Sequence, residues 1–382
     1  MKAKFYLIAA AACAALAACS KNEVAPVDVD QEITYQTIET KSAVGFNKTN
    51  VFKSYAYFLE SGKSWDDDYS TSASEYIKDA NIGYIASPTN AWKNVEYNGT
   101  NWIPAKTYYW PKQGSLTFFA WSMNDDKVPA ITGATVSSPA NKGITVTGYD
   151  ITQNRNRDFL VAEIAKDKTK NETQHESEVP EGTPGGTPWA KGVPTVFKHA
   201  LSSLAFTVQT VDGEGNAKDY STEGVTFKVK SIKLTGIETT ANYSQDWQNG
   251  SAASKHTWTP TGTGSPIPVF TNDSGQEVTE TAKPLLVAEA SDYTIVIPQT
   301  FSTEALEIVY TITTNYTGSD VTETVEYSTA KSNAINLKTK IYTQDWKPGY
   351  LYTVAIKFNL DEILWDPSVV EWENGTTLPI TL

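Results

Sequence analysis

The stretch that decides the fold is Val225-Thr-Phe-Lys-Val-Lys-Ser-Ile-Lys-Leu234, in which apolar and polar residues alternate. An alternation with a period of two is typical of a β-strand that has one buried face and one face in water. The alternation slips by one residue at Ser231 and resumes at Ile232. One extra residue in a strand makes a β-bulge, so we expect a bulge at this point.

The same alternation recurs along most of the chain. Further predicted strands cover residues 33–37, 52–59, 144–149, 159–165, 204–208, 293–297, 306–312 and 352–358. A hairpin is predicted from residues 106–110 and 116–121, because Pro111 and Gly114 supply the dihedral angles of a turn between them. The 11 Trp, 20 Tyr and 13 Phe also favour strands. Many short strands separated by turns predict an all-β fold built of β-sandwiches.

The N-terminal residues have the pattern of a bacterial export signal. Lys2 and Lys4 precede an uncharged apolar run, which closes with Leu16-Ala-Ala-Cys19. This order is typical of a signal peptide, and the small residues before the cysteine match the lipobox of bacterial lipoproteins. We therefore expect residues 1–18 to be removed and Cys19 to carry a lipid, with fatty acyl chains such as palmitate. The polar residues 19–32 are then a tether between the lipid and the fold.

The charge of the chain restricts its possible binding partners, and its cysteine content restricts the source of its stability. The formal net charge is −13, which argues against binding to nucleic acid or to an anionic lipid surface. The two cysteines are Cys13, inside the signal peptide, and Cys19, which the lipid modifies. The mature chain is therefore predicted to contain no free thiol and no disulfide, so its stability must come from its hydrophobic core.

A long polar segment divides the chain. Residues 166–194 carry charges and then several prolines and glycines, a composition that cannot form a core and that indicates a loop. With the length of the mature chain, this loop predicts an N-terminal domain over residues 33–190 and a C-terminal domain over residues 191–382.

Several segments together resemble a known family. They are Thr34-Tyr-Gln-Thr37, Thr107-Tyr-Tyr-Trp-Pro111, Leu116-Thr-Phe-Phe-Ala-Trp121, Asp158-Phe-Leu-Val-Ala162, Val196-Phe-Lys-His-Ala-Leu-Ser-Ser-Leu-Ala-Phe206, Trp346-Lys-Pro-Gly-Tyr350, Ile363-Leu-Trp-Asp-Pro367 and Val370-Glu-Trp372. In this order, after a lipobox, they resemble the fimbrillin-like (Mfa-like) lipoproteins of Bacteroidetes. The loop at residues 166–194 departs from the family pattern because it is expanded.

The resemblance implies a fold and a mode of assembly. It implies two tandem transthyretin-like Greek-key β-sandwich domains in a subunit of a type V pilus, carried to the outer membrane and the cell surface as a lipoprotein. Other pilin subunits are then its partners. A trypsin-like protease removes the N-terminal segment of such a subunit, and a strand from a neighbouring subunit fills the vacated groove.

Particular residues are candidates for these roles. Residues 33–41 are the candidate removable strand, and Lys41 is the candidate cleavage point because its surroundings are small and polar. Residues 368–382 are the candidate donor strand, since apolar residues alternate there: Val370, Trp372, Leu378, Ile380 and Leu382. The alternative for these residues is that they complete the second sandwich within their own chain.

A surface glycan-binding lipoprotein and an enzyme are the alternatives to a pilus subunit. A surface glycan-binding lipoprotein would stack exposed tryptophans on sugar rings, and four tryptophans in loop-like surroundings are candidates: Trp65, Trp92, Trp102 and Trp189. Core packing is the alternative for all four. An enzyme is not expected, because the three histidines, His175, His199 and His256, have no metal-ligand spacing and no nucleophile motif is present. We expect no metal and no cofactor.

Overall fold

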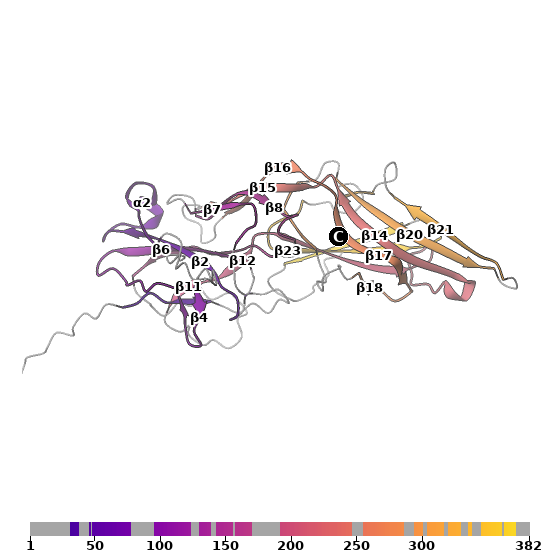
Figure 1. Ribbon diagram of the computed structural model, residues 1–382, viewed down its shortest axis with the longest axis horizontal. Helices are drawn as coiled ribbons and strands as arrows, with labels where there is room; N and C mark the ends of the chain where they lie inside the picture. The colour runs from indigo at the N-terminus through magenta and orange to yellow at the C-terminus, as the bar shows by residue number, and fades with distance from the viewer. Residues whose placement is uncertain are drawn as a thin grey trace, which may run out of the picture.

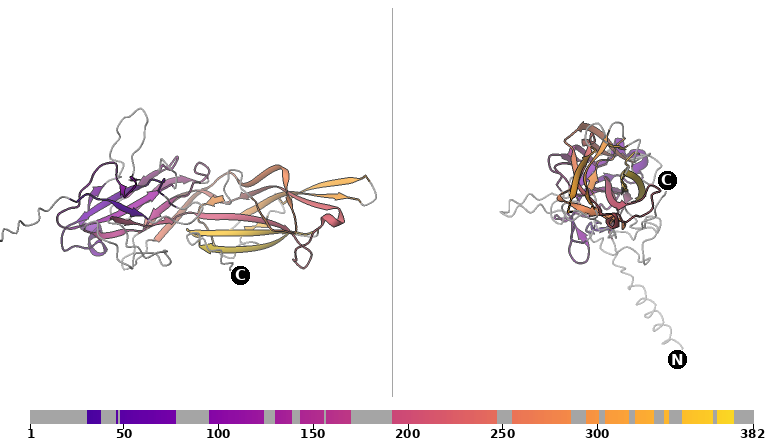
Figure 2. Two further views of the ribbon diagram at one scale, coloured as in Figure 1. Left: turned by 90° about the horizontal axis from the view of Figure 1, so that it is seen from below. Right: turned by 90° about the vertical axis from the view of Figure 1, so that its right-hand side faces the viewer.

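β-Strands make up nearly all of the regular structure. The computed structural model describes residues 31–37, 46, 48–77, 95–123, 130–138, 143–155, 157–169, 192–246, 255–285, 294–300, 304–316, 320–329, 335–337, 345–360 and 363–371. The molecule is elongated, with the first half of the chain at one end and the second half at the other (Figures 1 and 2). Among the described residues, no helix is long and apolar enough to cross a membrane. The chain is all-β, as predicted, because strands make up nearly all of its regular structure.

Two sheets form the half that contains the N-terminal strands, called here the first lobe. Their strand orders are β11-β1-β5-β4 and β12-β9-β6-β2-β3, with β10 also paired to β6. The bounds are β1 (Tyr35–Thr37), β2 (Lys53–Leu59), β3 (Ser74–Ile77), β4 (Glu96–Tyr97), β5 (Trp102–Ile103), β6 (Ser115–Ser122), β9 (Leu160–Ala162), β10 (Ala165–Lys168), β11 (Val193–Thr195) and β12 (Phe197–His199). Between the sheets lies an aromatic-rich core that includes Tyr35, Phe52, Trp102 and Phe118.

Two further sheets form the second lobe. Their orders are β18-β13-β23-β24, with β19 also on β13, and β17-β14-β20-β21, with β22 also on β20. The bounds are β13 (Ser202–Thr210), β14 (Val225–Thr235), β17 (Ile267–Val278), β18 (Lys283–Pro284), β19 (Thr294–Val296), β20 (Ala305–Asn315), β21 (Thr322–Ser328), β22 (Ile335–Asn336), β23 (Tyr350–Phe358) and β24 (Ile363–Glu371). The buried residues alternate along β13, β14 and β23, so their apolar faces meet in a shared core.

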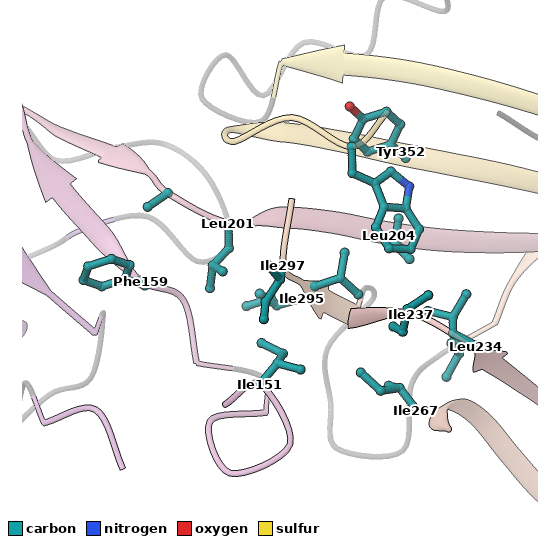
Figure 3. Packing of buried hydrophobic residues seen from close by; sticks show 14 of the residues in the cluster. Ile151, Phe159, Leu201, Leu204, Leu234, Ile237, Ile267, Ile295, Ile297 and Tyr352 are labelled. Carbon is teal, nitrogen blue, oxygen red and sulfur yellow. The ribbon is translucent and has the colours of Figure 1, made fainter. Parts of the chain in front are cut away.

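A fifth sheet joins the two halves of the chain. Its order is β16-β15-β8-β7, which pairs β7 (Thr135–Ser137) and β8 (Thr145–Asp150) with β15 (Glu238–Asp246) and β16 (Lys255–Thr263). One continuous cluster of buried side chains runs through the junction, and it includes Ile151, Phe159, Leu201, Ile237 and Ile297 (Figure 3). The lobes therefore share a core in addition to this sheet.

The predicted domain boundary between residues 190 and 191 stays a prediction. Two strands that follow it in sequence, β11 and β12, pair with β1 and β9 of the first lobe. Judged by strand pairing, the chain therefore passes from the first lobe to the second after His199.

The predicted bulge is confirmed, and the predicted hairpin is partly wrong. The register of β14 shifts between Val229 and Ser231 against both of its neighbours. By contrast, residues 106–110 do not pair with β6. Tyr108 and Trp110 instead form backbone hydrogen bonds with the N-terminal segment, and β6 pairs with β2, β9 and β10. The correction has a simple cause, since the N-terminal segment supplies hydrogen-bond partners that a local sequence pattern does not reveal.

Within the described ranges, two short helices interrupt the strands: α2 (Trp65–Ser72) and η2 (Ser221–Glu223). The backbone N–H of Trp65 donates to both carboxylate oxygens of Asp167, at 3.0 and 3.1 Å, so an acidic residue of β10 holds the N-terminus of α2. The indole of Trp65 packs against Tyr57 and Phe119 in the core.

Candidate assembly site

The N-terminal strand β1 occupies the middle of a sheet. It pairs in parallel with β11, with Tyr35 beside Val193 and Thr37 beside Thr195, and antiparallel with β5, with Tyr35 opposite Trp102. A strand so close to the N-terminus of the described chain therefore has neighbours on both sides. Its removal would leave two strand edges without a partner.

Backbone hydrogen bonds extend this pairing in front of β1. The N–H of Ile33 donates to the carbonyl oxygen of Tyr108 at 2.7 Å, and the N–H of Trp110 donates to the carbonyl oxygen of Gln31 at 2.9 Å. These two bonds flank a bridge between Glu32 and Tyr109, which makes this pair a non-hydrogen-bonded antiparallel pair. On the other side, the N–H of Val193 donates to the carbonyl oxygen of Thr34 at 2.8 Å.

The side chains of the N-terminal strand alternate between core and surface. Ile33, Tyr35 and Thr37 are buried, with 1%, 0% and 8% of their surface exposed, whereas Thr34 and Gln36 are half-buried. The ring of Tyr35 lies edge-on to Phe52, with centroids 5.4 Å apart. Burial raises the pKa of the Tyr35 hydroxyl above its ordinary value. The burial of Ile33 and Tyr35 contributes about 2 kcal/mol each to holding the strand in place.

A glycine allows β11 to approach β1 closely. A Cβ atom at Gly192 would lie 2.9 Å from the carbonyl carbon of Tyr35 and 3.1 Å from the backbone nitrogen of Gln36. These neighbours are backbone atoms, which cannot move aside as a flexible side chain can. Gly192 is therefore a residue of this site, and its sequence context does not indicate this role, because it lies at the end of a long polar segment.

This arrangement defines a slot for one extended strand. Without residues 31–37, the backbones of β11 and β5 and of residues 108–110 would lose hydrogen-bond partners, and the surrounding apolar side chains would face water. Another strand with apolar residues at every second position would satisfy the backbone groups and fill the slot. The geometry thus suits the exchange of one strand for another.

The candidate donor strand begins within β24. Ser368 to Glu371 pair antiparallel with β23 of the same chain, and Val370 lies opposite Leu351. The described part of the candidate donor strand thus completes the second lobe. The other four candidates, Trp372, Leu378, Ile380 and Leu382, lie outside the described residues.

Two of the four tryptophans proposed to contact glycans are buried. Trp65 is 1% exposed in α2 and Trp102 is 3% exposed in β5, so the prediction that they lie in exposed loops is wrong. Neighbouring aromatic rings cover both indoles: Tyr57, Tyr69 and Phe119 for Trp65, and Phe46, Phe52 and Tyr97 for Trp102. Their faces cannot stack on a sugar in this structure. Trp92, Trp189, Lys41 and Cys19 lie outside the described residues.

His199 makes a buried polar pair at the end of β12. Its Nδ1 lies 2.5 Å from Oδ2 of Asp158, and the two residues are 4% and 1% exposed. In the described part of the chain, no three side chains of His, Cys, Asp or Glu gather as they would around a metal ion.

The fold and the slot together define an all-β protein whose N-terminal strand completes a sheet. The model of the fimbrillin-like family matches residues 67–372, so the chain belongs to this family of structural fimbrial subunits. No curated protein gives a significant match to the chain.

Solved structures of other proteins resemble this chain at low sequence identity. A proposed cell adhesion protein of Bacteroides uniformis is 14% identical, with 91% of this chain and 99% of that chain covered and a TM-score of 0.44. The tip fimbrial protein Mfa3 of Porphyromonas gingivalis, with a C-terminal truncation, is 12% identical, with coverages of 90% and 100% and a TM-score of 0.33. A fimbrial assembly protein of Parabacteroides distasonis is 8% identical, with coverages of 90% and 99% and a TM-score of 0.35. The assignment to the family rests on the family model.

Proposed function

We propose that this protein is a subunit of a cell-surface fimbria that polymerises when a neighbouring subunit's strand replaces its own N-terminal strand. The observation that carries the proposal is the position of β1, which lies between β11 and β5 with Ile33 and Tyr35 buried. An N-terminal strand in the middle of a sheet can be cut from the chain without breaking any other element. Its loss then creates a binding site for an equivalent strand.

Cleavage after Lys41 is the trigger in this proposal. Lys41 follows Thr37, the last residue of β1, in a small and polar stretch of sequence. A cut there frees residues 19–41 from the remainder of the chain, and only non-covalent contacts then retain β1. A contact in which one subunit's tail enters the next subunit's slot is head-to-tail, so it does not close and it propagates as a filament.

The donor is proposed to be the chain beyond β24. Leu378, Ile380 and Leu382 alternate with other residues there, as a strand that fills an apolar slot requires. Deletion of residues 374–382 leaves β24 whole and removes these three side chains. The deleted protein is expected to lose polymerisation after trypsin treatment and to remain folded by circular dichroism.

Trypsin treatment of the complete chain tests the trigger. We expect the treated protein to begin at Ser42 on N-terminal sequencing and to form a ladder of bands on a gel that disappears on heating. The variant Lys41→Gln is expected to form no ladder. The proposal fails if the cut protein stays monomeric, or if surface-shed fimbrial protein still begins at Cys19.

The lipid anchor belongs to the same proposal. Leu16-Ala-Ala-Cys19 predicts an outer-membrane lipoprotein, exposed at the cell surface until the tether is cut. Labelling of cells with a fatty-acid analogue is expected to mark the intact chain and not the protein that begins at Ser42. A surface glycan-binding role has no support from Trp65 and Trp102, the two candidate tryptophans that the structure describes, because both are buried.

A further inference from the structure

The second lobe has an open strand edge that the proposed assembly does not use. β21 stands at the end of the order β17-β14-β20-β21, and no other described strand pairs with its outer edge. It forms a hairpin with β20 at the end of the molecule remote from the first lobe (Figures 1 and 2). All seven residues of β21 are exposed, its register against β20 has no bulge, and it contains neither Pro nor Lys. Proteins usually protect long, regular edges with such residues or bulges.

The hydrogen-bonding register between β20 and β21 determines which backbone groups of β21 point toward the open edge. The N–H of Tyr316 donates to the oxygen of Val321, and the N–H of Thr329 donates to the oxygen of Ile308. Hydrogen-bonded and non-hydrogen-bonded pairs alternate along antiparallel strands, so Val325 lies in a hydrogen-bonded pair with β20. The N–H and C=O groups of its neighbours Thr324 and Glu326 therefore point toward the open edge.

An apolar strip reaches the same edge. Tyr310 of β20 packs against Phe358 of β23 in the core, with ring centroids 5.2 Å apart, and Tyr327 of β21 stacks on Tyr310 at 5.2 Å. Val325 and Tyr327 share this face of the sheet, yet they are 40% and 42% exposed. The apolar face of the sheet thus continues past the core and stops at an uncovered edge.

We propose that β21 pairs with β21 of a second copy of this chain, antiparallel, about a two-fold axis at Val325. This register places Val325 opposite Val325 of the second copy, Thr324 opposite Glu326 and Glu323 opposite Tyr327. All seven residues of the strand take part, and the open N–H and C=O groups of Thr324 and Glu326 bond to each other across the axis. The apolar strips of the two copies become one continuous surface.

Both carboxylates of β21 are already engaged, so a second copy can approach the strand, and the positions of these charges select the register. The carboxylate of Glu326 is already paired with Lys230 at 2.7 Å, and that of Glu323 accepts a hydrogen bond from the Tyr316 hydroxyl at 2.9 Å. An axis at Glu323 or at Glu326 would set like charges directly opposite each other, which is unfavourable. An axis at Thr324 would shorten the overlap of the two strands. The axis at Val325 avoids both costs.

The pairing is expected to be weak between free subunits. One edge of seven residues buries less surface than a standard stable interface, which covers about 1,600 Å² in total. Subunits that are held together at a membrane or along a filament gain effective concentration, so many weak pairs act together. The edge then joins two filaments, or two anchored subunits, side by side. This inference does not depend on the exchange of β1.

Single-cysteine cross-linking tests the pairing and its register. The complete chain, purified in detergent without protease, is oxidised as Val325→Cys, Val321→Cys or Thr324→Cys, and the unsubstituted chain gives the background from its own cysteines. Only position 325 lies opposite its own copy in a non-hydrogen-bonded pair, where a disulfide forms readily, so Val325→Cys should dimerise about tenfold faster than Val321→Cys. Val321 is 58% exposed, which makes it a control for accessibility.

Each outcome decides the proposal. A reducible dimer that forms fastest with Val325→Cys supports the pairing and its axis. Equal rates for Val325→Cys and Val321→Cys overturn the pairing, because accessibility alone would then set the rate. A dimer that forms fastest with Thr324→Cys overturns the axis at Val325. If the trypsin-treated chain fails to form filaments while the cross-linking is unchanged, only the proposed exchange of β1 is contradicted.

Discussion

Gly192 lies directly against the backbone of Tyr35, so close that a Cβ atom at Gly192 would come within 2.9 Å of the Tyr35 carbonyl carbon. This contact joins the segment before β11 to the N-terminal strand. Because both sides of the contact are backbone, no change of side-chain rotamer can make room for a larger residue. The retention of β1 therefore depends on the absence of a side chain at position 192.

The variant Gly192→Ala is expected to loosen β1. The added methyl group forces β1 and β11 apart, which should lower the free energy of unfolding by about 1–3 kcal/mol. Hydrogen exchange measured by mass spectrometry should become faster over residues 33–37. Gly213→Ala is the matched control, because a Cβ atom there has no neighbour within 4 Å. Equal exchange in the two variants would contradict the role given to Gly192.

The buried pair of His199 and Asp158 is expected to matter far more than an exposed ion pair. His199→Ala leaves the carboxylate of Asp158 buried without this partner, which typically costs about 3–5 kcal/mol. Lys230→Ala breaks the pair with Glu326 at the surface, where such pairs are worth ~1 kcal/mol or less. Urea unfolding of both variants measures the difference. Similar losses in the two variants would show that burial does not set the strength of the pair.

His256 is expected to make the fold less stable at acidic pH. Burial, aided by the charge of Lys198, lowers the pKa of His256 from 6.5 to about 4. The neutral ring can accept a hydrogen bond from the Tyr243 hydroxyl, which lies 2.7 Å from Nδ1. Between about pH 6.5 and pH 4 the unfolded chain takes up a proton that the folded chain does not, so stability falls as the pH is lowered.

The size of this effect is measured by comparison with His256→Gln. The shift corresponds to at most about 3 kcal/mol, and the partial exposure of the ring reduces this value. Urea unfolding at pH 7 and at pH 4.5 is expected to show a smaller loss of stability in the variant than in the unsubstituted chain. The same loss in both proteins would mean that His256 does not contribute to the acid sensitivity.

Alternation in the sequence predicted strands that have one buried face, such as β13, β14 and β23. The alternation from Val225 to Leu234 predicted β14 and its bulge, because burial of every second residue requires an apolar residue there. β21 was not predicted, because all seven of its residues are exposed and no buried face therefore imposes an alternation of apolar and polar residues along the whole strand. Alternation in the local sequence therefore indicates strands that pack on a core and does not indicate strands at an open edge.

Contacts between distant residues explain the remaining differences. The helix α2 has no apolar period of its own, and Asp167, far away in sequence, holds its first N–H group at Trp65. The hairpin was predicted wrongly because the backbone of Tyr108 pairs with Ile33 instead of with β6. Of the candidate slot, only the terminal strand could be predicted from sequence. The role of Gly192 depends on the pairing of β11 with β1, which the local sequence does not indicate.

A reversible lock on the N-terminal segment tests the central claim most directly. Glu32 and Tyr109 form a non-hydrogen-bonded antiparallel pair, a geometry that accepts a disulfide, so Glu32→Cys with Tyr109→Cys should tie the segment to the first lobe. After trypsin treatment the oxidised protein should keep the segment and stay monomeric, and the reduced protein should release the segment and polymerise. Polymerisation of the oxidised, cut protein to the same extent as the reduced protein would contradict strand exchange at β1.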